Sequence, residues 1–290
     1  MTIEVVEFLQ GLQNGFMDFF FNFVSFIGEK YFYIAVISYI YWIYDKRLGE
    51  IMGMSLAFSA VTNNIIKEAV GAERPYQKYP DRATNFRPGS STGHSFPSGH
   101  VQNFTSIVFG AYYKVKKRWM FYTALTLSIL MMLSRMYLGV HFLEDVVVSL
   151  ILGITIGFAV NKLYVKFDKD IDKLYKIFVI ILVVLSPLLF ILKDNDFFTG
   201  MGLFYGFILA MIFERKYVNF SHDIPLIKKV TRYVIGVILL LVLQIGLGNV
   251  FSMIYGESIS LENIFDFIRY FLVAFVAFGV YPYIFKKYNF

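Results

Sequence analysis

Long apolar runs recur along the whole chain, and they constrain its fold more than any other feature. Each run is about as long as a helix must be to cross a hydrocarbon layer roughly 30 Å thick. The runs are residues 31–45, 51–67, 98–113, 119–138, 143–161, 174–192, 197–213, 230–250 and 264–285. Lipid cannot hydrogen-bond to open backbone groups, so each run is expected to be a helix. The sequence therefore predicts an all-α, polytopic membrane helix bundle with about nine transmembrane helices.

The composition favours a membrane protein over a soluble domain. Hydrophobic residues make up 57% of the chain and charged residues only 17%, whereas about a quarter of the residues in soluble domains are charged. The chain has no cysteine. This excludes a disulfide framework, a thiolate nucleophile and a zinc–thiolate site.

The stretch before the first run mixes Gln, Asn and Asp with Phe and Val at helical spacing. This pattern is typical of an amphipathic helix that lies in the membrane interface. A tenth span over residues 5–28 is the alternative. The stretch has no positive leading region, so it is not expected to be a cleaved signal peptide.

The lysines and arginines indicate how the predicted bundle is oriented. With nine spans and the N-terminus outside, 18 of the 27 lie on one side of the membrane. Cytoplasmic loops are enriched in Lys and Arg, so that side is expected to be cytoplasmic. Loop 68–97 and turn 138–142 then face outward. Loop 68–97 is the longest polar segment, and loops of that length are usually functional or disordered.

Three short blocks stand out beside the predicted helices. They are KEAVGAERP at 67–75, PSGH at 97–100 and SRMYLGVHFLED at 134–145. The first block follows the second run, the second opens the third run, and the last joins the fourth and fifth runs. All these helix ends face the same side of the membrane, so we expect their polar side chains to converge at one depth.

The basic residues of these blocks suit a phosphate group. Lys67, Arg74 and Arg135 bring three positive charges, of which arginine supplies a planar fork and lysine a point charge. Ser98 and Gly99 open a helix, where backbone N–H groups and the helix dipole favour an anion.

Two histidines would complete the site. His141 and Asp145 are four residues apart on one helical face. The carboxylate can hold one imidazole nitrogen protonated and leave the other free to attack phosphorus. His100 can then protonate the departing oxygen. Carboxylates near the site are too few for a magnesium cage, so neither a metal nor another cofactor is expected.

The three blocks resemble the motifs of the type 2 phosphatidic acid phosphatase superfamily. The resemblance covers residues 67–145, with every characteristic position filled in order. It implies a metal-independent hydrolase in which His141 is the nucleophile, His100 the general acid and Asp145 the orienting partner of His141. It also implies that the phosphate is held by Lys67, Arg74, Ser98, Gly99 and Arg135. Common lipid phosphatases of the family have about six spans, so the last three spans here are additional.

This interpretation divides the chain into three parts. They are an N-terminal interfacial helix (1–30), a catalytic phosphatase core bundle (31–195) and additional C-terminal transmembrane helices (196–290).

Several polar residues also have simpler interpretations. Lys67 and Arg135 can be charges that snorkel from helix ends, and His141 with Asp145 can be a structural pair. Basic residues of the outer loop can attract an acidic head group or form a solvated face; they are Lys78, Arg82 and Arg87. For the remaining polar residues we expect a loop position for His94, solvation for His222, an interfacial position for Glu144 and a structural ion pair between Asp266 and Arg269. Substrate contact is the alternative for His94 and for the Asp266–Arg269 pair.

The function predicted from the sequence is hydrolysis of a lipid phosphomonoester or diphosphate through a phosphohistidine. Undecaprenyl diphosphate, phosphatidate and phosphatidylglycerol phosphate are the candidate substrates. A lipid phosphotransferase with the same intermediate, a transporter of phosphorylated lipids and a haloperoxidase-like use of vanadate are the alternatives. We expect a plasma-membrane location with the site on the extracytoplasmic face, a membrane and a lipid phosphate as partners, and no nucleic acid.

Overall fold

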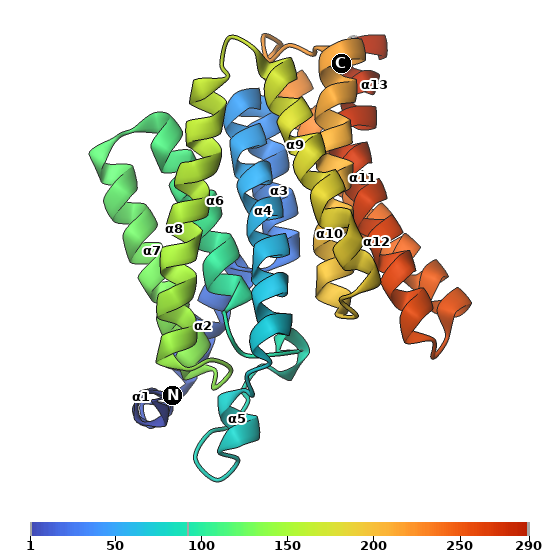
Figure 1. The fold of residues 1–290 in the computed structure, drawn as a ribbon. Coiled ribbons are helices and arrows are strands. Elements are labelled where there is room, and N and C mark those ends of the chain that lie inside the picture. The colour runs from blue at the N-terminus through green and yellow to red at the C-terminus, as the bar shows by residue number, and fades with distance from the viewer. Residues whose placement is uncertain (1, 92, 289–290) are drawn as a thin grey trace.

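The computed structural model describes residues 2–91 and 93–288, and within those ranges it contains helices and loops but no strand. Figure 1 shows an elongated bundle with the N-terminus and the short helix α5 at one end and α13 at the other. The first part of the chain forms α1 (Ile3–Gln10), α2 (Gly15–Ile27), α3 (Lys30–Tyr39), the π-helix η1 (Ile40–Tyr44), α4 (Lys46–Val70), α5 (Pro75–Lys78) and the 3-10 helix η2 (Pro88–Ser90).

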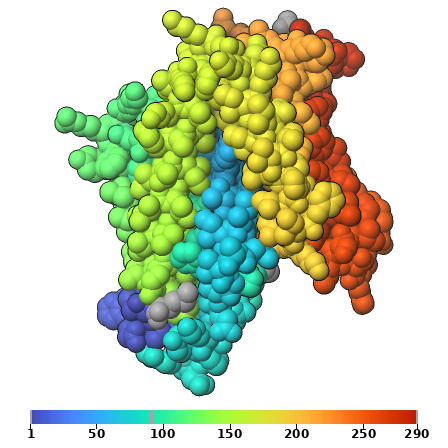
Figure 2. All heavy atoms as spheres, in the orientation of Figure 1, coloured from blue at the N-terminus to red at the C-terminus, as the bar shows by residue number. Residues whose placement is uncertain are grey.

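The remaining helices complete the bundle. They are α6 (Gly99–Val115), α7 (Arg118–Tyr137), α8 (Leu143–Lys166), α9 (Ile171–Leu185), η3 (Ser186–Phe190), α10 (Asn195–Phe213), η4 (Glu214–Val218), α11 (Leu226–Tyr255), α12 (Ile259–Phe275), η5 (Val276–Val280) and α13 (Tyr281–Tyr288). Figure 2 shows the side chains of α4 as a strip between those of α8 and those of α9 and α10. Helix α4 is therefore central, since it packs against α6, α8 and α10.

Each predicted apolar run coincides with one helix or with two or three consecutive helices. Within the described ranges, six helices are long and apolar enough to span a membrane, and the pair α2 and α3, bent by 55°, would make a seventh. Helix α4 carries buried polar residues that include Asn63, Asn64 and Lys67, and α6 carries buried Gln102, Thr105 and Ser106. These polar side chains lower the hydropathy of α4 and α6, and neither helix is among the six. The predicted count of nine spans is therefore not confirmed and stays a prediction.

The N-terminal segment forms two helices rather than the single helix predicted from its spacing. Helix α1 ends before Gly11, and the Asn14 side chain caps α2 by accepting hydrogen bonds from the backbone N–H groups of Phe16 and Met17. A capping asparagine starts a new helix because it satisfies N–H groups that would otherwise have no partner. Phe16 is 70% exposed while Phe21 is buried. This asymmetry suits an interface, but the interfacial location stays a prediction.

The end of α4 is determined by local sequence. Gly71 adopts a left-handed conformation, with φ of 64°, and its N–H bonds to the carbonyl of Lys67. Glycine accepts this backbone conformation without steric cost. Pro75 then begins the short helix α5. Lys67 is thereby kept in the last turn of α4, while Arg74 lies in the loop that follows.

Glycines allow α6 and α8 to pack at close range. A Cβ atom on Gly157 would lie 2.7 Å from the backbone nitrogen of Gly110 and 2.8 Å from the carbonyl oxygen of Ser106. Small residues commonly serve this purpose between membrane helices. The close approach holds the middle turns of the two helices together. At their N-terminal ends, where the sequence places the PSGH and His141 blocks, the backbone N–H of Ser98 bonds to the carbonyl of Asp145 at 3.5 Å.

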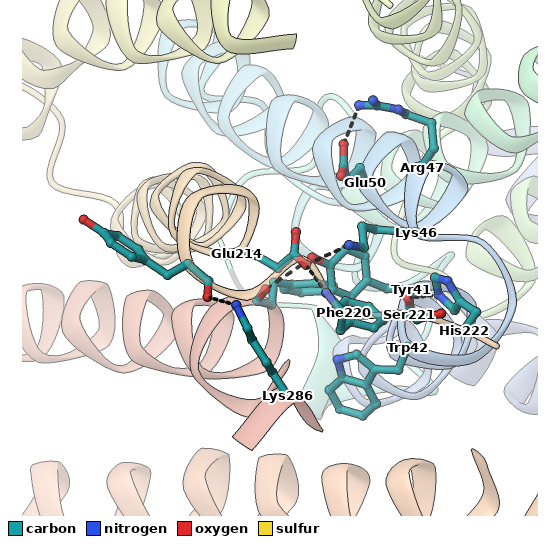
Figure 3. Close-up of polar contacts among 12 residues, drawn as sticks. Tyr41, Trp42, Lys46, Arg47, Glu50, Glu214, Phe220, Ser221, His222 and Lys286 are labelled. Atoms are coloured by element: carbon teal, nitrogen blue, oxygen red, sulfur yellow. Dashed lines mark hydrogen bonds and ion pairs between the residues drawn. The ribbon is translucent and has the colours of Figure 1, made fainter. Parts of the chain in front are cut away.

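A polar network at the opposite end joins the C-terminal helices to the rest of the bundle (Figure 3). Lys46 at the start of α4 forms a 2.7 Å ion pair with Glu214 of η4. Glu214 also accepts a hydrogen bond from the backbone N–H of Phe220. Nearby, Lys286 donates to the carbonyl of Tyr217. These contacts link α4 to η4, the loop after it and α13.

His222 belongs to the same network, contrary to its predicted solvation. Its Nε2 lies 2.9 Å from the carbonyl oxygen of Tyr41, and the residue is only partly exposed. The loop after η4 folds back onto η1, which covers the imidazole. His222 therefore has a structural contact far from the predicted site.

We predict that Gly157→Ala destabilises the protein. The new methyl group meets backbone atoms of α6 that cannot rotate away, and overpacking of this kind costs about 1–3 kcal/mol. Thermal unfolding in detergent should show a lower Tm than that of the native protein. Gly246→Ala is the matched control, because a Cβ atom there has no neighbour within 4 Å. An unchanged Tm for Gly157→Ala would contradict the close packing of α6 and α8.

Candidate active site

A cavity of about 570 Å³ opens where the C-terminal end of α4 meets the N-terminal end of α6 and the loop before α8. Its lining includes five of the eight predicted site residues, which are Lys67, Arg74, Gly99, His100 and His141. Ser98, Arg135 and Asp145 lie behind this lining and are fully buried. The three sequence blocks therefore meet at one end of the bundle.

Arg74 ties the outer loop to the turn before α8. Its Nε donates to the carbonyl of Gly93 at 3.0 Å, and its Nη1 donates to the carbonyl of Val140 at 2.9 Å. The same Nη1 lies 3.4 Å from Nε2 of His141. The side chain is 2% exposed, so the guanidinium is held rigidly next to the imidazole.

Asp145 holds His141 from the other side. Its Oδ2 lies 3.4 Å from Nδ1 of His141 and accepts a 2.8 Å hydrogen bond from the backbone N–H of Phe142. Asp145 is in the first turn of α8, whereas His141 lies in the loop just before that helix. The carboxylate thus fixes both the turn and the orientation of the ring.

The neighbours of His141 determine its tautomer. Arginine can only donate hydrogen bonds, so Nε2, which faces Arg74, must present a lone pair. Nδ1 faces the carboxylate of Asp145, which can only accept a hydrogen bond. We infer that the proton is on Nδ1 and that Nε2 is the nitrogen able to attack an electrophile.

Burial and neighbouring charges favour the neutral form of the imidazole. Burial lowers the pKa of His141 well below its ordinary value, and the positive charges of Arg74, Arg135 and Lys67 lower it further. A neutral imidazole retains the lone pair that a nucleophile needs.

Ser95 is a site residue that sequence reasoning missed. Its hydroxyl donates a 2.5 Å hydrogen bond to Oδ2 of Asp145 and lies 3.5 Å from Nδ1 of His141. The residue is fully buried. Its position three residues before Ser98 was visible in the sequence, but only the fold brings it to a carboxylate 50 positions away.

His100 faces the cavity from the first turn of α6. Its Nε2 is buried and has no hydrogen-bond partner within residues 2–91 and 93–288. Two amides support this turn. Asn63 donates to the carbonyl of Pro97 at 3.3 Å and to the side-chain oxygen of Gln102 at 2.9 Å. An unpartnered buried nitrogen beside a cavity is suited to a ligand that enters the cavity.

Lys67 brings a cation to the wall formed by α4. It is 7% exposed, and among the described residues no carboxylate lies within ion-pair distance of its ammonium group. Asp196 at the start of α10 lines the same cavity. No group of three or more His, Asp and Glu side chains close enough to hold a metal ion occurs in the described part of the chain.

Arg135 and Ser98 are placed less directly than their motifs suggest. The Nη1 of Arg135 donates to the hydroxyl of Ser25 at 2.6 Å, and Arg135 does not line the cavity. Ser98 precedes α6, and its hydroxyl makes no hydrogen bond within the described ranges. Direct contact of either residue with phosphate stays a prediction.

The outer basic residues have a structural role that the sequence did not reveal. Arg82 forms a 2.6 Å ion pair with Glu7 of α1, and Arg87 forms one with Glu29, between α2 and α3. These pairs fasten the N-terminal helices to the outer loop. Lys78 is exposed, and His94 is not among the cavity residues.

Two further expectations concern acidic residues away from the cavity. Asp266 and Arg269 form the predicted structural ion pair at 2.7 Å. Glu144 accepts hydrogen bonds from the backbone and the hydroxyl of Thr2. It therefore holds the start of the chain against α8.

Comparison with known families gives two matches that together span most of the chain. Residues 50–169 match the PAP2 superfamily, and residues 198–290 match the description "PAP2 superfamily phosphatase, transmembrane extension". The chain belongs to the PAP2 superfamily. This confirms the resemblance inferred from the three motifs. The matched extension and the apolar helices make it a multi-span membrane protein.

Curated relatives within this superfamily are named as lipid phosphatases. A probable sphingosine-1-phosphate phosphatase of Dictyostelium discoideum is 26% identical over 53% of this chain and 40% of its own length. A lipid A 4'-phosphatase of Porphyromonas gingivalis is 23% identical over 54% and 70%. Phosphatidylglycerophosphatase B of Bacillus subtilis is 30% identical over 43% and 60%. The chain spans about two fifths of the length of the first relatives that it matches.

Two solved structures resemble part of this PAP2 chain. LpxE of Aquifex aeolicus has a TM-score of 0.48 and 21% identity, covering 55% of this chain and 93% of its own. A transmembrane PAP2-type phosphatidylglycerolphosphate phosphatase from Bacillus subtilis has a TM-score of 0.47 and 22% identity, covering 57% and 84%.

We predict that inorganic phosphate stabilises this PAP2 protein and that Lys67→Met removes the effect. A ligand that binds only the folded state raises the Tm, and the Lys67 ammonium is a main source of positive charge on the cavity wall. Thermal unfolding with and without phosphate measures the shift, which should be a few degrees for the native protein. Lys78→Met, at the exposed end of the short helix α5, should keep the full shift. Equal shifts in both variants would argue against phosphate binding in this cavity.

Proposed function

We propose that this PAP2 protein is a membrane phosphatase that hydrolyses a phosphomonoester or diphosphate of an amphiphilic lipid. The observation that carries the proposal is the environment of His141. A buried carboxylate faces Nδ1, a guanidinium faces Nε2, and the ring borders a cavity that a second histidine and a lysine also line. Membership of the superfamily and the names of the curated relatives support the same activity.

The phosphate would bind between the positive groups and the start of α6. Arg74 and Lys67 supply charge from two walls of the cavity, and Gly99 allows the backbone close to the ligand. A Cβ atom on Gly99 would lie 3.3 Å from Oδ1 of Asn63, which leaves little space for a side chain. Arg135, buried behind the cavity lining, is proposed to stabilise the phosphate through its charge. Ser98 is proposed to act through the first turn of α6, which it precedes.

In the first step, Nε2 of His141 attacks phosphorus and the bond from phosphorus to the lipid oxygen breaks. His100 gives its proton to that oxygen, so the lipid leaves as an alcohol or, from a diphosphate, as a monophosphate. Nδ1 of His141 keeps its proton, and the positive charge that develops on the ring is stabilised by Asp145. The fixed cations stabilise the equatorial oxygens of the phosphoryl group.

In the second step, water attacks the phosphorus of the phosphohistidine. His100, now neutral, takes a proton from the water, and the bond from phosphorus to Nε2 breaks. Inorganic phosphate leaves and both histidines return to their starting states. No step requires a metal ion, because protein cations provide the charge that magnesium supplies in other phosphoryl transfers.

We propose that the site faces the extracytoplasmic side of the plasma membrane. The end opposite the cavity carries most of the lysines and arginines, among them Lys46, Lys116 and Arg118. Positive charge of this kind is retained on the cytoplasmic side. The substrate would then be a lipid whose phosphate lies in the outer leaflet, such as undecaprenyl diphosphate, phosphatidate or phosphatidylglycerol phosphate.

A panel of lipid monophosphates and diphosphates in detergent tests the proposed activity through released phosphate. EDTA should leave the rate unchanged; strong inhibition would contradict the metal-free mechanism. The panel is repeated with an acceptor lipid that carries a free hydroxyl. Phosphate that appears only on the acceptor would replace the hydrolase with a phosphotransferase. Binding without turnover of any member would favour a transporter.

We predict that His141→Ala abolishes turnover, with a loss of at least about 10³-fold, because the nucleophile is removed. His222→Ala, at the opposite end of the bundle, should keep its activity. An acid-labile, base-stable phosphoenzyme should form in the native protein and in His222→Ala but not in His141→Ala. Normal activity of His141→Ala would remove this residue from the mechanism.

We also predict the acid limb of the pH profile. Because burial and neighbouring cations lower the pKa of His141, its neutral form persists as the pH falls below about 6.5, the usual value for histidine. The acid limb of kcat/KM, which reports on the free enzyme, should therefore lie below that pH. Lys67→Met removes one of these cations, so the limb should move to higher pH. A limb at or above pH 7 in the native protein would contradict the neutral nucleophile.

A further inference from the structure

The cavity extends well beyond the phosphate site. From Lys67 and His141 it continues along α4 toward the middle of the bundle, between the core helices and the C-terminal helices. Its lining includes Leu56 and Gly53 of α4, and on the opposite side Leu203 and Phe207 of α10. The titratable groups are gathered at the His141 end, and the other end is mainly apolar.

The deep part of the cavity is bounded by two parts of the chain. The core contributes α3 and α4, whose residues Ile37 and Leu56 line it. The C-terminal extension contributes α10, α11, α12 and η5, represented by Leu203, Leu240 and Val273. Neither part encloses this space alone, so the chamber exists only because residues 198–290 pack against the core.

The chamber is deeper than the hydrocarbon part of one leaflet of a bilayer. Lys67 and Gly53 are 14 residues apart on a single helix, which corresponds to about 21 Å at 1.5 Å per residue. Half of a hydrocarbon core about 30 Å thick is about 15 Å. A hydrocarbon chain that reaches across one leaflet can therefore lie along α4 while its head group is at His141.

Aromatic side chains close the far end. A Cβ atom on Gly53 would lie 2.4 Å from the ring of Phe207, so this glycine permits the ring to pack directly onto α4. Phe207 is 1% exposed and stacks edge-on against Phe278 with 4.7 Å between ring centroids. Beyond them, the network around Lys46 and Glu214 (Figure 3) holds the extension to the core. The chamber is thus a closed-ended space with a defined maximum length.

The open end carries groups suited to the boundary between head group and tail. Lys30 at the start of α3 donates a 3.2 Å hydrogen bond to the hydroxyl of Tyr270 on α12. Both residues line the cavity, as does Tyr31, which is 38% exposed. Lysine and tyrosine are typical of the membrane–water boundary. This pair marks the position where α3 and α12 meet and where a tail can enter from the side.

We propose that the C-terminal helices form, with α3 and α4, a binding chamber for one extended hydrocarbon chain of the substrate, closed by Phe207 and Phe278. The proposal rests on the proposed phosphatase function and adds a selection for chain length. A tail that moves from lipid into the chamber gains little free energy, because both environments are apolar. The chamber therefore selects by fit: a chain that is too long meets the aromatic end.

A series of n-alkyl phosphates, used below their micelle concentrations, tests this selection. For the native protein, kcat/KM should rise with each methylene by up to about fourfold, as expected for burial from water, and then level off or fall once the chamber is full. Ala60→Phe places a ring in the chamber about two turns below Lys67. It should lower kcat/KM for dodecyl phosphate at least tenfold more than for ethyl phosphate.

Leu209→Phe is the matched control. It adds the same ring to α10 at a position that is 39% exposed and outside the cavity, so the full chain-length profile should persist. If Ala60→Phe does not fold, Leu203→Phe blocks the same space from the α10 side. If the blocked variant lowers kcat/KM by the same factor for ethyl and dodecyl phosphate, the proposed chamber is wrong.

Photo-crosslinking tests binding of the tail in the chamber independently of catalysis. Hexadecyl phosphate with a diazirine at its terminal carbon is bound to the His141→Ala variant, so no turnover is needed. Adducts are expected on residues of the closed end, such as Phe207, Leu240 or Phe278, and Ala60→Phe in this background should remove them. Adducts confined to lipid-facing residues would overturn the chamber. If no alkyl or lipid phosphate is hydrolysed by the native protein, the phosphatase proposal fails, while crosslinks at the closed end would still establish the chamber.

Discussion

The structure depends on how hydrogen bonds and opposite charges compensate the buried polar groups at one end of an apolar bundle. Asp145, His141 and Arg74 are almost completely shielded from solvent, and isolated ions in such an environment would be costly. Asp145 accepts hydrogen bonds from Ser95 and from the backbone of Phe142, and the guanidinium of Arg74 donates to two carbonyls. The same contacts that make these groups tolerable hold the imidazole of His141 in one orientation. Stability and chemical competence therefore have a common origin here.

The C-terminal helices extend the cavity that the three motifs border. The core helices carry all the groups proposed to act on phosphorus, while the extension adds apolar walls and an aromatic closed end. Polar contacts at the opposite end join the two parts, with Lys46 paired to Glu214. In the proposed function, this arrangement separates the groups that act on phosphorus from the apolar walls that bind the tail.

The helices and the motif residues could be predicted from the sequence, but many of the residues that hold the motif residues in place could not. Apolar runs and helix-end motifs are local features, and they predicted where Lys67, Arg74, His100 and His141 would converge. Ser95 and Asn63 gave no comparable signal, because their partners are distant in sequence. Arg87 was equally ambiguous, since a basic loop residue can serve substrate or structure, and only its contact with Glu29 decided between them. The break between α1 and α2 was overlooked because helical spacing continues across Gly11 and Asn14.

The sequence by itself determined that this chain is helical, that it belongs in a membrane and that its three polar motifs share one end of a bundle. Those properties follow from hydropathy, helix periodicity and short spacings, all of which act within a few turns of chain. The tertiary structure alone decided which nitrogen of His141 faces Arg74, why Arg135 lies behind the cavity and how far the cavity reaches along α4. Each of these depends on contacts between helices far apart in sequence, and side-chain packing at such contacts is not encoded in any local pattern.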